Sequence, residues 1–412
     1  MRILWFVNTP FPEIVSKLNL KGDYMGTWMS SLKKALIKTP GFQSDSEDRL
    51  GIVCALPNIS DPQIFHMDKV SYFCIPKSRM SQYTQEYKRE ISHCIHVVKV
   101  FDPDIVHVHG TEEFYGLISE RTEKPVVISI QGILSAIVRV YFENMRYTEI
   151  FQAPRMIRHY LIMCRKARTE QRIFRTNHYF IGRTQWDKAQ MISLVNSKCT
   201  YYQCDEVMDE EFYKESWTID KSESFTIACT SSSYAYKGIH SILEAMTYLI
   251  NRLPDARLHI YGSFPPFAYG AFLRKKIEKL GLTNHVRFCG FKNSKYLAME
   301  LKKARAFVMA SYMENSSNSL QEAMLLGVPS VVSYTGGIPS IAEHGKNCLM
   351  FPRGDAAVMA DCLYRIITDD NLSRKISEAS KTKAVKRNNP EKISKELLEI
   401  YKDVIIQKGK LN

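Results

Sequence analysis

The sequence contains no apolar run long enough to cross a membrane. A membrane-spanning helix needs about 18 consecutive apolar residues, and every apolar run in this 412-residue chain ends well short of that length. The run ILWFV near the N-terminus is too short for the core of a signal peptide, and no small-residue cleavage site follows it. We therefore expect a cytoplasmic protein.

Paired cysteines are also missing. The chain has 10 cysteines, none in a CxxC pair, and the closest two, Cys199 and Cys204, have the wrong spacing for a zinc knuckle. We expect buried or free thiols in a reducing compartment. We find no internal repeat, no low-complexity segment and no DxD-type motif placed to hold a metal-bound diphosphate. The expected protein therefore has neither a metal site nor a cofactor.

The charge balance is positive, with 56 Lys and Arg against 43 Asp and Glu, a net charge of +13. Such a charge suits an anionic partner, although a solvated basic surface explains most of it. Residues 139–175 stand out because nine Lys or Arg and three Glu alternate with aromatic residues. This pattern is typical of a helical surface on an anionic membrane or of a helix pair packed on a sheet. No nucleic-acid-binding module is recognisable, and no nucleic-acid partner is expected.

Short apolar runs alternate with helical patterns along the chain. Most of the runs close at Gly, Pro or Ser, and they are typical of strands covered on both faces, as in parallel sheets. They occupy residues 3–7, 51–56, 71–76, 104–110, 125–132, 178–184, 225–232, 257–263, 285–291, 306–311 and 329–334. Helical patterns between them include residues 28–37, 84–100, 241–253, 272–280 and 355–367. This alternation predicts an α/β fold.

An acidic, polar passage at residues 205–224 separates the two halves. The length also favours two domains. We expect two facing, doubly wound, Rossmann-like domains with a cleft between them, at residues 1–210 and 211–388, followed by a C-terminal helix within 389–412. Ligands of open α/β sheets bind at the carboxyl ends of the strands, so candidate site residues should follow the apolar runs.

The stretch SYMENSSNSLQEAMLLGVPSVVSY, residues 311–334, places two carboxylates around the start of one predicted helix. Glu314 follows an apolar run, and Glu322 lies about one turn inside a helix that starts near Asn318 and Ser319. Free N–H groups at a helix start bind anions, especially phosphate. The two carboxylates would then accept hydrogen bonds from sugar and ribose hydroxyls. The alternative is a first-turn Glu that complements the helix dipole, together with an exposed loop Glu.

The pattern E-x7-E, followed by AM, G-x-P, an apolar strand and two glycines at 336 and 337, resembles the retaining nucleotide-sugar glycosyltransferases of family 4, also called group 1. Their fold is GT-B. The resemblance is specific over residues 225–355, where further matching stretches are AYKG (235–238), VRFCGF (286–291) and SYTGGIPSIAEHGKNCLMFPRGD (333–355).

In the first half the resemblance is looser. IGRTQWDKA (181–189) and YYQCDE (201–206) are similar to a subgroup of bacterial surface-polysaccharide transferases. The resemblance implies retaining, metal-independent transfer of a hexosyl-type sugar from a nucleotide-sugar to a glycan or lipid-linked glycan acceptor bound by the first domain. It also implies that the C-terminal helix packs back on the first domain. Residues 139–175 would then hold the enzyme peripherally on the inner face of the membrane.

The resemblance also implies roles for individual residues of the second domain. Lys237 would stabilise the departing diphosphate, although a solvated surface lysine is the usual reading of such a position. Glu314 would orient the donor sugar, and Glu322 would bind the ribose. Gly290 and Phe291 would frame the nucleobase.

Positions 231, 232 and 131 depart from the pattern of the relatives. Ser231 and Ser232 stand where relatives usually carry an Arg, so Lys237 and the helix dipole would carry more of the phosphate charge. Gln131 stands where many relatives have a His. Because a neutral amide is neither acid nor base at pH 7, Gln131 would position a hydroxyl while the leaving phosphate takes the acceptor's proton. Gly26 would let the backbone approach the ligand, or it belongs to a simple turn.

His107 and His109 are two residues apart on one strand and therefore point to the same face. His109, at the strand end, could reach the cleft, whereas His107 is expected to be a structural histidine.

Two rival functions stay open. A nucleotide-sugar epimerase or hydrolase on the same fold would need an acid–base pair, and Gln131 argues against one. A non-catalytic binding protein derived from a transferase would explain the departures at Gln131, Ser231 and Ser232.

Overall fold

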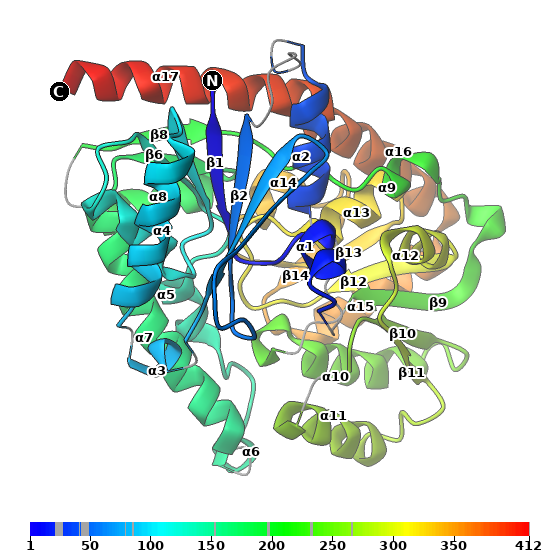
Figure 1. Ribbon diagram of the computed structural model, residues 1–412. Coiled ribbons are helices and arrows are strands. Elements are labelled where there is room, and N and C mark those ends of the chain that lie inside the picture. Colours follow the sequence, from blue (N-terminus) through cyan, green and yellow to red (C-terminus); the bar gives the residue numbers. More distant parts are fainter. Residues whose placement is uncertain are drawn as a thin grey trace. The chain divides into compact units, whose positions relative to one another are not determined.

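The computed structural model describes residues 1–20, 28–40, 42, 49–78, 80–84, 86–151, 154–195, 198–230, 234–264 and 267–411. The chain forms two compact units. The first unit consists of Met1–Val138, Leu161–Val207 and Asn389–Asn412, and the second consists of Arg139–Tyr160 and Met208–Asn388 (Figure 1).

The first unit is built on an eight-stranded sheet in the order β3-β4-β2-β1-β5-β6-β7-β8. Neighbouring strands are parallel except β3 and β4. The strands are β1 (Ile3–Val7), β2 (Leu50–Leu56), β3 (Gln63–Met67), β4 (Val70–Pro76), β5 (Ile105–His109), β6 (Val126–Ser129), β7 (Tyr179–Gly182) and β8 (Thr200–Gln203). The helices are α1 (Pro12–Lys17), α2 (Trp28–Lys38), α3 (Ser81–Thr84), α4 (Lys88–Phe101), η1 (Phe114–Glu120), α5 (Leu134–Ile137), η2 (Val138–Val140), α8 (Gln185–Leu194) and α17 (Pro390–Leu411).

The second unit contains a six-stranded, parallel sheet in the order β11-β10-β9-β12-β13-β14. Its strands are β9 (Glu223–Thr230), β10 (Arg257–Tyr261), β11 (Val286–Gly290), β12 (Ala304–Met309), β13 (Ser330–Tyr334) and β14 (Leu349–Pro352). Its helices are α6 (Tyr147–Phe151), α9 (Glu211–Lys214), η3 (Ile219–Lys221), η4 (Ala235–Lys237), α10 (Ile239–Ile250), α11 (Phe267–Lys279), α12 (Ser294–Leu301), α13 (Asn318–Leu326), α14 (Ile338–Ile341), α15 (Ala356–Thr368) and α16 (Asp370–Arg387). Helix α7 (Pro154–Thr176) starts in this unit and continues into the first.

All of the predicted strands are present. Most of their apolar runs fill positions that are covered on both faces, whereas the edge strand β11 has no fully buried residue. Every residue of β1, β5 and β12 is buried, as expected for central parallel strands. Three strands were not predicted. Of these, β3 is mostly exposed and pairs antiparallel at the edge of its sheet, so its sequence carries no buried run.

Residues 139–160 belong to the second unit, whereas the expected domain boundary placed them in the first. Phe142 and Met145 pack against the core of the second unit. Asn144 Nδ2 donates to the carbonyl oxygen of Gly354 at 3.1 Å, and Arg353 Nε lies 3.0 Å from Glu143 Oε1. These contacts join positions some 200 residues apart, so the local sequence pattern could not predict them.

Helix α17 completes the core of the first unit and packs along α2 (Figure 1). The hydroxyl of Tyr401 accepts a hydrogen bond from Trp5 Nε1 at 2.9 Å and lies 2.6 Å from His107 Nδ1. The other ring nitrogen of His107 lies 2.7 Å from Ser129 Oγ. Burial lowers the pKa of His107 to about 3. The prediction that His107 is a structural histidine is confirmed.

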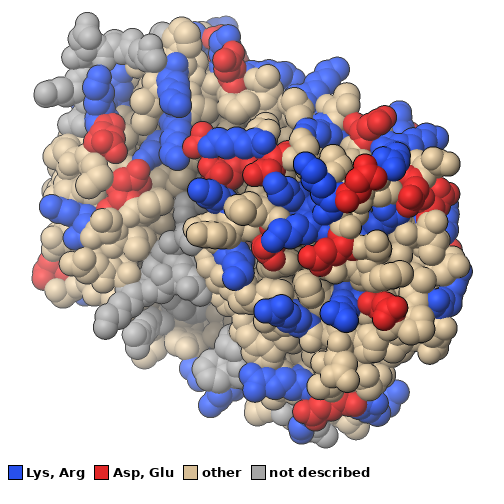
Figure 2. Space-filling view, turned by 90° about the vertical axis from the view of Figure 1, so that its right-hand side faces the viewer, with Lys and Arg blue, Asp and Glu red and all other residues tan. Residues whose placement is uncertain are grey.

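The distribution of surface charge and the state of the cysteines match what the composition led us to expect. On the face shown in Figure 2, basic side chains are interspersed with acidic ones over most of the surface. All ten cysteines are free. Over the described ranges, the helices are all too short or too polar to cross a membrane.

Replacing Tyr401 with Phe should lower the free energy of unfolding of the first unit by about 1–3 kcal/mol, because the buried Trp5 N–H and a ring nitrogen of His107 would lose their partner. Urea unfolding followed by tryptophan fluorescence measures the change. Tyr296→Phe, on an exposed side chain, is the matched control and should be neutral. Equal stabilities of the two variants would contradict the assigned role of α17.

Candidate functional site

The candidate site lies at the carboxyl ends of two neighbouring strands in the second unit. The strand order changes direction between β9 and β12, which pair directly. Open α/β sheets bind ligands at such a switch point, because the loops that follow the two strands diverge. Lys237 follows β9 in the short turn η4, and Glu314 follows β12. Ser231 and Ser232 lie outside the described residues.

The structure brings the predicted residues Lys237 and Glu314 into direct contact. Lys237 Nζ lies 2.6 Å from Glu314 Oε1, and Ser311 Oγ donates to the same oxygen at 2.7 Å. Within the described residues, Glu314 Oε2 has no hydrogen-bond partner, so it can accept a bond from a ligand. Because the two side chains were predicted separately, their pairing is a new finding.

Two glycines allow the segments that carry this pair to approach each other. At Gly238, with φ +73°, a Cβ atom would lie 2.1 Å from the carbonyl oxygen of Ala310. At Gly336, with φ +48°, a Cβ atom would lie 1.9 Å from the carbonyl oxygen of Glu314. Such distances exclude a side chain at either position. The N–H of Tyr312 also donates to the carbonyl oxygen of Tyr236 at 2.7 Å and holds η4 against the end of β12.

The local environment keeps Lys237 charged. Burial opposes the charge, but Glu314 and the neighbouring tyrosines outweigh it and raise the pKa of Lys237 to about 12. The ammonium group also lies 5.4 Å from the ring centroid of Tyr236. A cation at the switch point is therefore available to a negatively charged ligand.

Helix α13 begins close to the predicted position, with a different cap. Its N-cap is Ser317, whose Oγ accepts from the N–H of Leu320 at 3.4 Å, whereas Asn318 and Ser319 were expected to cap it. These two residues instead form the first turn. First-turn N–H groups have no partner inside the helix, and the described residues provide none for Asn318 or Ser319.

Glu322 lies one turn inside α13 and is partly buried. Burial, with a smaller contribution from the negative charge of Asp209, raises the pKa of Glu322 to about 8. No side chain of the described residues hydrogen-bonds to Glu322. The group is therefore mostly protonated at neutral pH, and donors supplied by a ligand would favour its ionised form.

The predicted base-binding residues lie at the edge strand β11. Gly290 is the last residue of β11, and its carbonyl oxygen accepts from the N–H of Gly262 at 3.0 Å. The side chain of Phe291 is 39% exposed. An exposed aromatic ring next to a strand end suits a planar ligand group, but no contact fixes the role of either residue.

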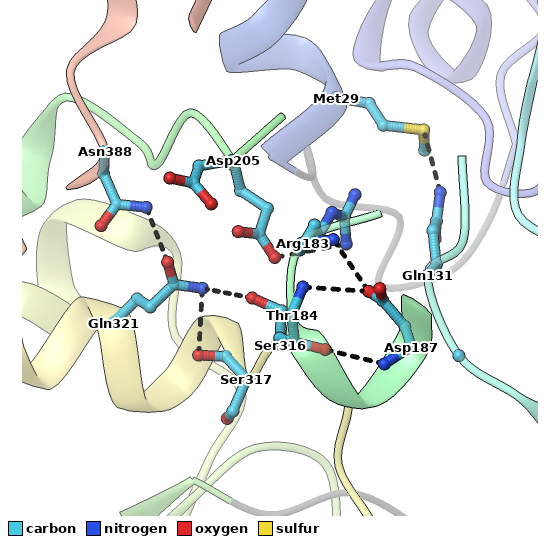
Figure 3. Close-up of polar contacts among 12 residues, drawn as sticks. Met29, Gln131, Arg183, Thr184, Asp187, Asp205, Ser316, Ser317, Gln321 and Asn388 are labelled. Carbon is cyan, nitrogen blue, oxygen red and sulfur yellow. Dashed lines mark hydrogen bonds and ion pairs between the residues drawn. The ribbon is translucent and has the colours of Figure 1, made fainter. Parts of the chain in front are cut away.

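The other predicted residues belong to the first unit. Gln131 follows β6, and its Nε2 lies 3.9 Å from Met29 Sδ (Figure 3). Gly26 lies outside the described residues. The position of His109 at a strand end left open that it could reach the cleft, but its ring is fully buried and packs edge-on against Trp5 and Trp28.

A buried ion pair in the first unit was not predicted. Arg183 Nη1 lies 3.3 Å from Glu206 Oε1, and both side chains are buried. The guanidinium lies 4.4 Å from the ring centroid of Trp28, and the N–H of Arg183 donates to Asp187 Oδ2 at 2.8 Å (Figure 3). Arg183 follows β7 and Glu206 follows β8, so no local sequence signal identifies this pair.

Comparison with known proteins identifies relatives of the second unit. Residues 209–383 match the family model described as "Glycosyl transferases group 1". The 2-deoxystreptamine N-acetyl-D-glucosaminyltransferase of Niallia circulans is 26% identical over 175 residues, 42% of this chain and 44% of that protein. The putative colanic acid biosynthesis glycosyltransferase WcaL of Salmonella typhimurium is 30% identical over 176 residues, 41% of this chain and 42% of that protein. The chain thus matches less than half the length of these two relatives.

Solved structures resemble the chain over nearly its whole length. Sucrose-phosphate synthase from Thermosynechococcus elongatus superposes with a TM-score of 0.75 at 14% identity and covers 99% of this chain and 100% of its own. HepE from Anabaena, solved in complex with UDP, gives a TM-score of 0.67 at 16% identity and covers 98% and 100%. At these identities the likeness shows the fold, which is the two-domain GT-B fold expected from the sequence.

Replacing Glu322 with Gln should flatten the pH dependence of stability. The pKa of Glu322 is raised from an ordinary value of 4.5 to about 8, so the folded protein holds a proton that the unfolded chain releases. Its contribution to stability is therefore complete below about pH 4.5 and is lost as pH rises through about 8. Urea unfolding over this range should show a smaller loss for Glu322→Gln than for the wild type. Glu278→Gln, on an exposed glutamate, should lose as much stability over this pH range as the wild type. The same pH dependence of stability in all three proteins would contradict a raised pKa of Glu322.

Proposed function

We propose that the protein transfers a sugar from a nucleotide-sugar donor to a glycan or lipid-linked glycan acceptor, starting from the match of residues 209–383 to the family model of the group 1 glycosyltransferases. The observation that carries the proposal is the pairing of Lys237 with Glu314 beside the start of α13. The pair lies at the sheet switch point, and the segment that carries Glu314 leads into α13, which supplies two free N–H groups and the second carboxylate, Glu322. This set fits a ligand with a negatively charged diphosphate between two hydroxyl-bearing groups.

The proposed reaction is retaining. The bond between the sugar C1 and the donor phosphate oxygen breaks, and a bond from C1 to the acceptor oxygen forms on the same face. The acceptor's proton passes to the leaving phosphate, and a nucleoside diphosphate departs. Gln131, which has no acid or base function at neutral pH, would position a hydroxyl. Lys237 and the N–H groups of Asn318 and Ser319 would balance the phosphate charge without a metal ion.

The two glutamates would bind the ends of the donor. Glu314 Oε2 would accept from a sugar hydroxyl, while Oε1 remains with Ser311. Glu322 would accept from the ribose, which would favour its ionised form. Gly290 and Phe291 would contact the base. Because HepE was solved with UDP and with UDP-glucose, UDP-sugars are the first candidates.

Lys237→Met should lower kcat/KM for the donor by about 100- to 1000-fold, because the departing diphosphate would lose its principal cation. Calorimetry with UDP-, GDP- and ADP-sugars identifies the donor, and turnover is then measured with that donor. Lys276→Met removes a partly buried lysine paired with Glu244 elsewhere in the same unit and should leave kcat/KM unchanged.

An assay without an acceptor and measurements on two variants also separate the transferase from the two rival functions. Rapid formation of an epimer or free sugar without an acceptor would favour an epimerase or hydrolase. Unchanged nucleotide affinity and turnover in both Lys237→Met and Glu322→Ala would sink the transferase assignment in favour of a binding protein.

We also propose that the enzyme acts at an anionic membrane surface, as a peripheral protein of the cytoplasmic side. In the second unit, Tyr147 and Phe151 of α6 are 81% and 75% exposed. In the first unit, the exposed residues of α7 recur every three or four positions and are mainly basic, at Leu161, Arg165, Arg168, Arg172 and Arg175. The opposite face of this part of α7 is buried, so the basic face is the one open to lipid head groups.

Wild-type protein should co-sediment with vesicles that contain phosphatidylglycerol and not with neutral phosphatidylcholine vesicles. Combined Tyr147→Ser and Phe151→Ser substitutions should weaken this binding about tenfold, because exposed aromatic rings insert at the lipid interface. Tyr248→Ser with Tyr296→Ser, on two other exposed tyrosines, is the matched control. Equal binding to both lipids would remove the membrane proposal and leave the transferase proposal intact.

A further inference from the structure

Gln321 is a polar residue on the buried side of α13. Its side chain is fully buried, as are those of Leu320, Met324 and Leu325 on the same helix. Packed faces of helices are usually apolar, and a buried amide costs free energy unless both its oxygen and its nitrogen have partners. The surroundings of Gln321 must therefore supply those partners.

Both ends of the Gln321 amide are hydrogen-bonded (Figure 3). Its Oε1 accepts from Asn388 Nδ2 at 2.7 Å and from Arg387 Nε at 3.2 Å. Its Nε2 donates to Ser316 Oγ at 3.2 Å and to the carbonyl oxygen of Ser317 at 3.4 Å. Because donors face one end and acceptors face the other, the network determines the orientation of the amide.

These partners lie at the ends of two helices. The two serines lead into α13, whereas Arg387 is the last residue of α16 and Asn388 is its C-cap. Asn388 is itself fully buried, and its carbonyl oxygen accepts from the hydroxyl of Tyr213 in α9 at 2.5 Å. Gln321 therefore connects the start of α13 to the end of α16 and, through Asn388, to α9.

We propose that Gln321 is a positioning residue for the donor, an inference that rests on the function proposed above. It holds the peptide groups that lead into α13 and thereby sets the direction of the N–H groups of Asn318 and Ser319. The carbonyl oxygen of Ser317 also accepts from the backbone N–H of Gln321 at 3.1 Å. Without the side chain, this backbone bond and the Ser317 cap of Leu320 remain, but the helix start loses its hydrogen bonds to Arg387 and Asn388 at the end of α16. Gln321 acts from the protein interior and does not touch the donor.

Gln321→Met and Asn388→Leu test this role, because both replacements are uncharged and similar in shape to the original side chains. Gln321→Met should weaken UDP binding about tenfold, the order expected when a buried hydrogen-bonded group loses its partners. Asn388→Leu should weaken UDP binding less. The double variant should bind UDP no worse than Gln321→Met, since both substitutions break the same contact between the two amide side chains. Calorimetric dissociation constants for UDP measure these changes.

Ser373→Ala is the matched control. Ser373 is fully buried on α16, and its Oγ donates to the carbonyl oxygen of Ile366 at 2.6 Å, away from the start of α13. This variant should lose stability but keep its affinity for UDP. Hydrogen exchange in the free protein provides a second measurement: the amides of residues 315–320 should exchange faster in Gln321→Met and at the wild-type rate in Ser373→Ala.

The outcomes are distinguishable. Wild-type affinity for UDP and unchanged exchange at residues 315–320 in Gln321→Met would overturn the positioning role while the proposed function stands. If Ser373→Ala lost the same affinity for UDP, Gln321 would contribute only to general stability. That outcome would also overturn the positioning role. A wild-type protein that binds neither UDP, GDP nor ADP would overturn the proposed function and the inference together.

Discussion

The ion pair between Lys237 and Glu314 joins the two segments that leave the central strands of the second unit. Glycine at positions 238 and 336 is what lets these segments meet, because a side chain at either one would overlap a carbonyl oxygen. Breaking a partly buried pair leaves an uncompensated charge, which is costly. A bound diphosphate would offset that cost by replacing Glu314 as the counter-charge of Lys237, so that donor entry and release of the glutamate would be coupled.

The groups around this pair have one property in common, which is that the protein does not fully satisfy them. Glu314 Oε2 and the N–H groups of Asn318 and Ser319 have no partner within the described residues, and Glu322 is held with a raised pKa. One ligand with a negative centre and hydroxyl groups on both sides would satisfy all of these groups. Gln321 shows the opposite arrangement on the buried side of the same helix, where every polar atom of the side chain is paired.

Local pattern was enough to predict the parts of the fold that depend on burial. The runs that became β1, β5 and β12 are mostly apolar and buried on both faces, whereas β3 lies at an edge and is mostly exposed, so nothing marked it. Lys237 and Glu314 were each predicted from position, but their contact depends on β9 and β12 being neighbours. Ser317, rather than its neighbours, became the cap because backbone geometry decides among three similar polar residues. The Arg183–Glu206 pair required knowledge that β7 and β8 lie side by side.

The placement of residues 139–160 bears on any attempt to build chimeras from this chain. A fragment of the second unit that began at residue 208 would lack Phe142 and Met145, which pack against its core, and would lack Glu143 opposite Arg353. Such a fragment would expose the apolar surface that these two residues cover in the second unit. Transfer of the complete second unit to another chain therefore requires two separate stretches of sequence to be transplanted together.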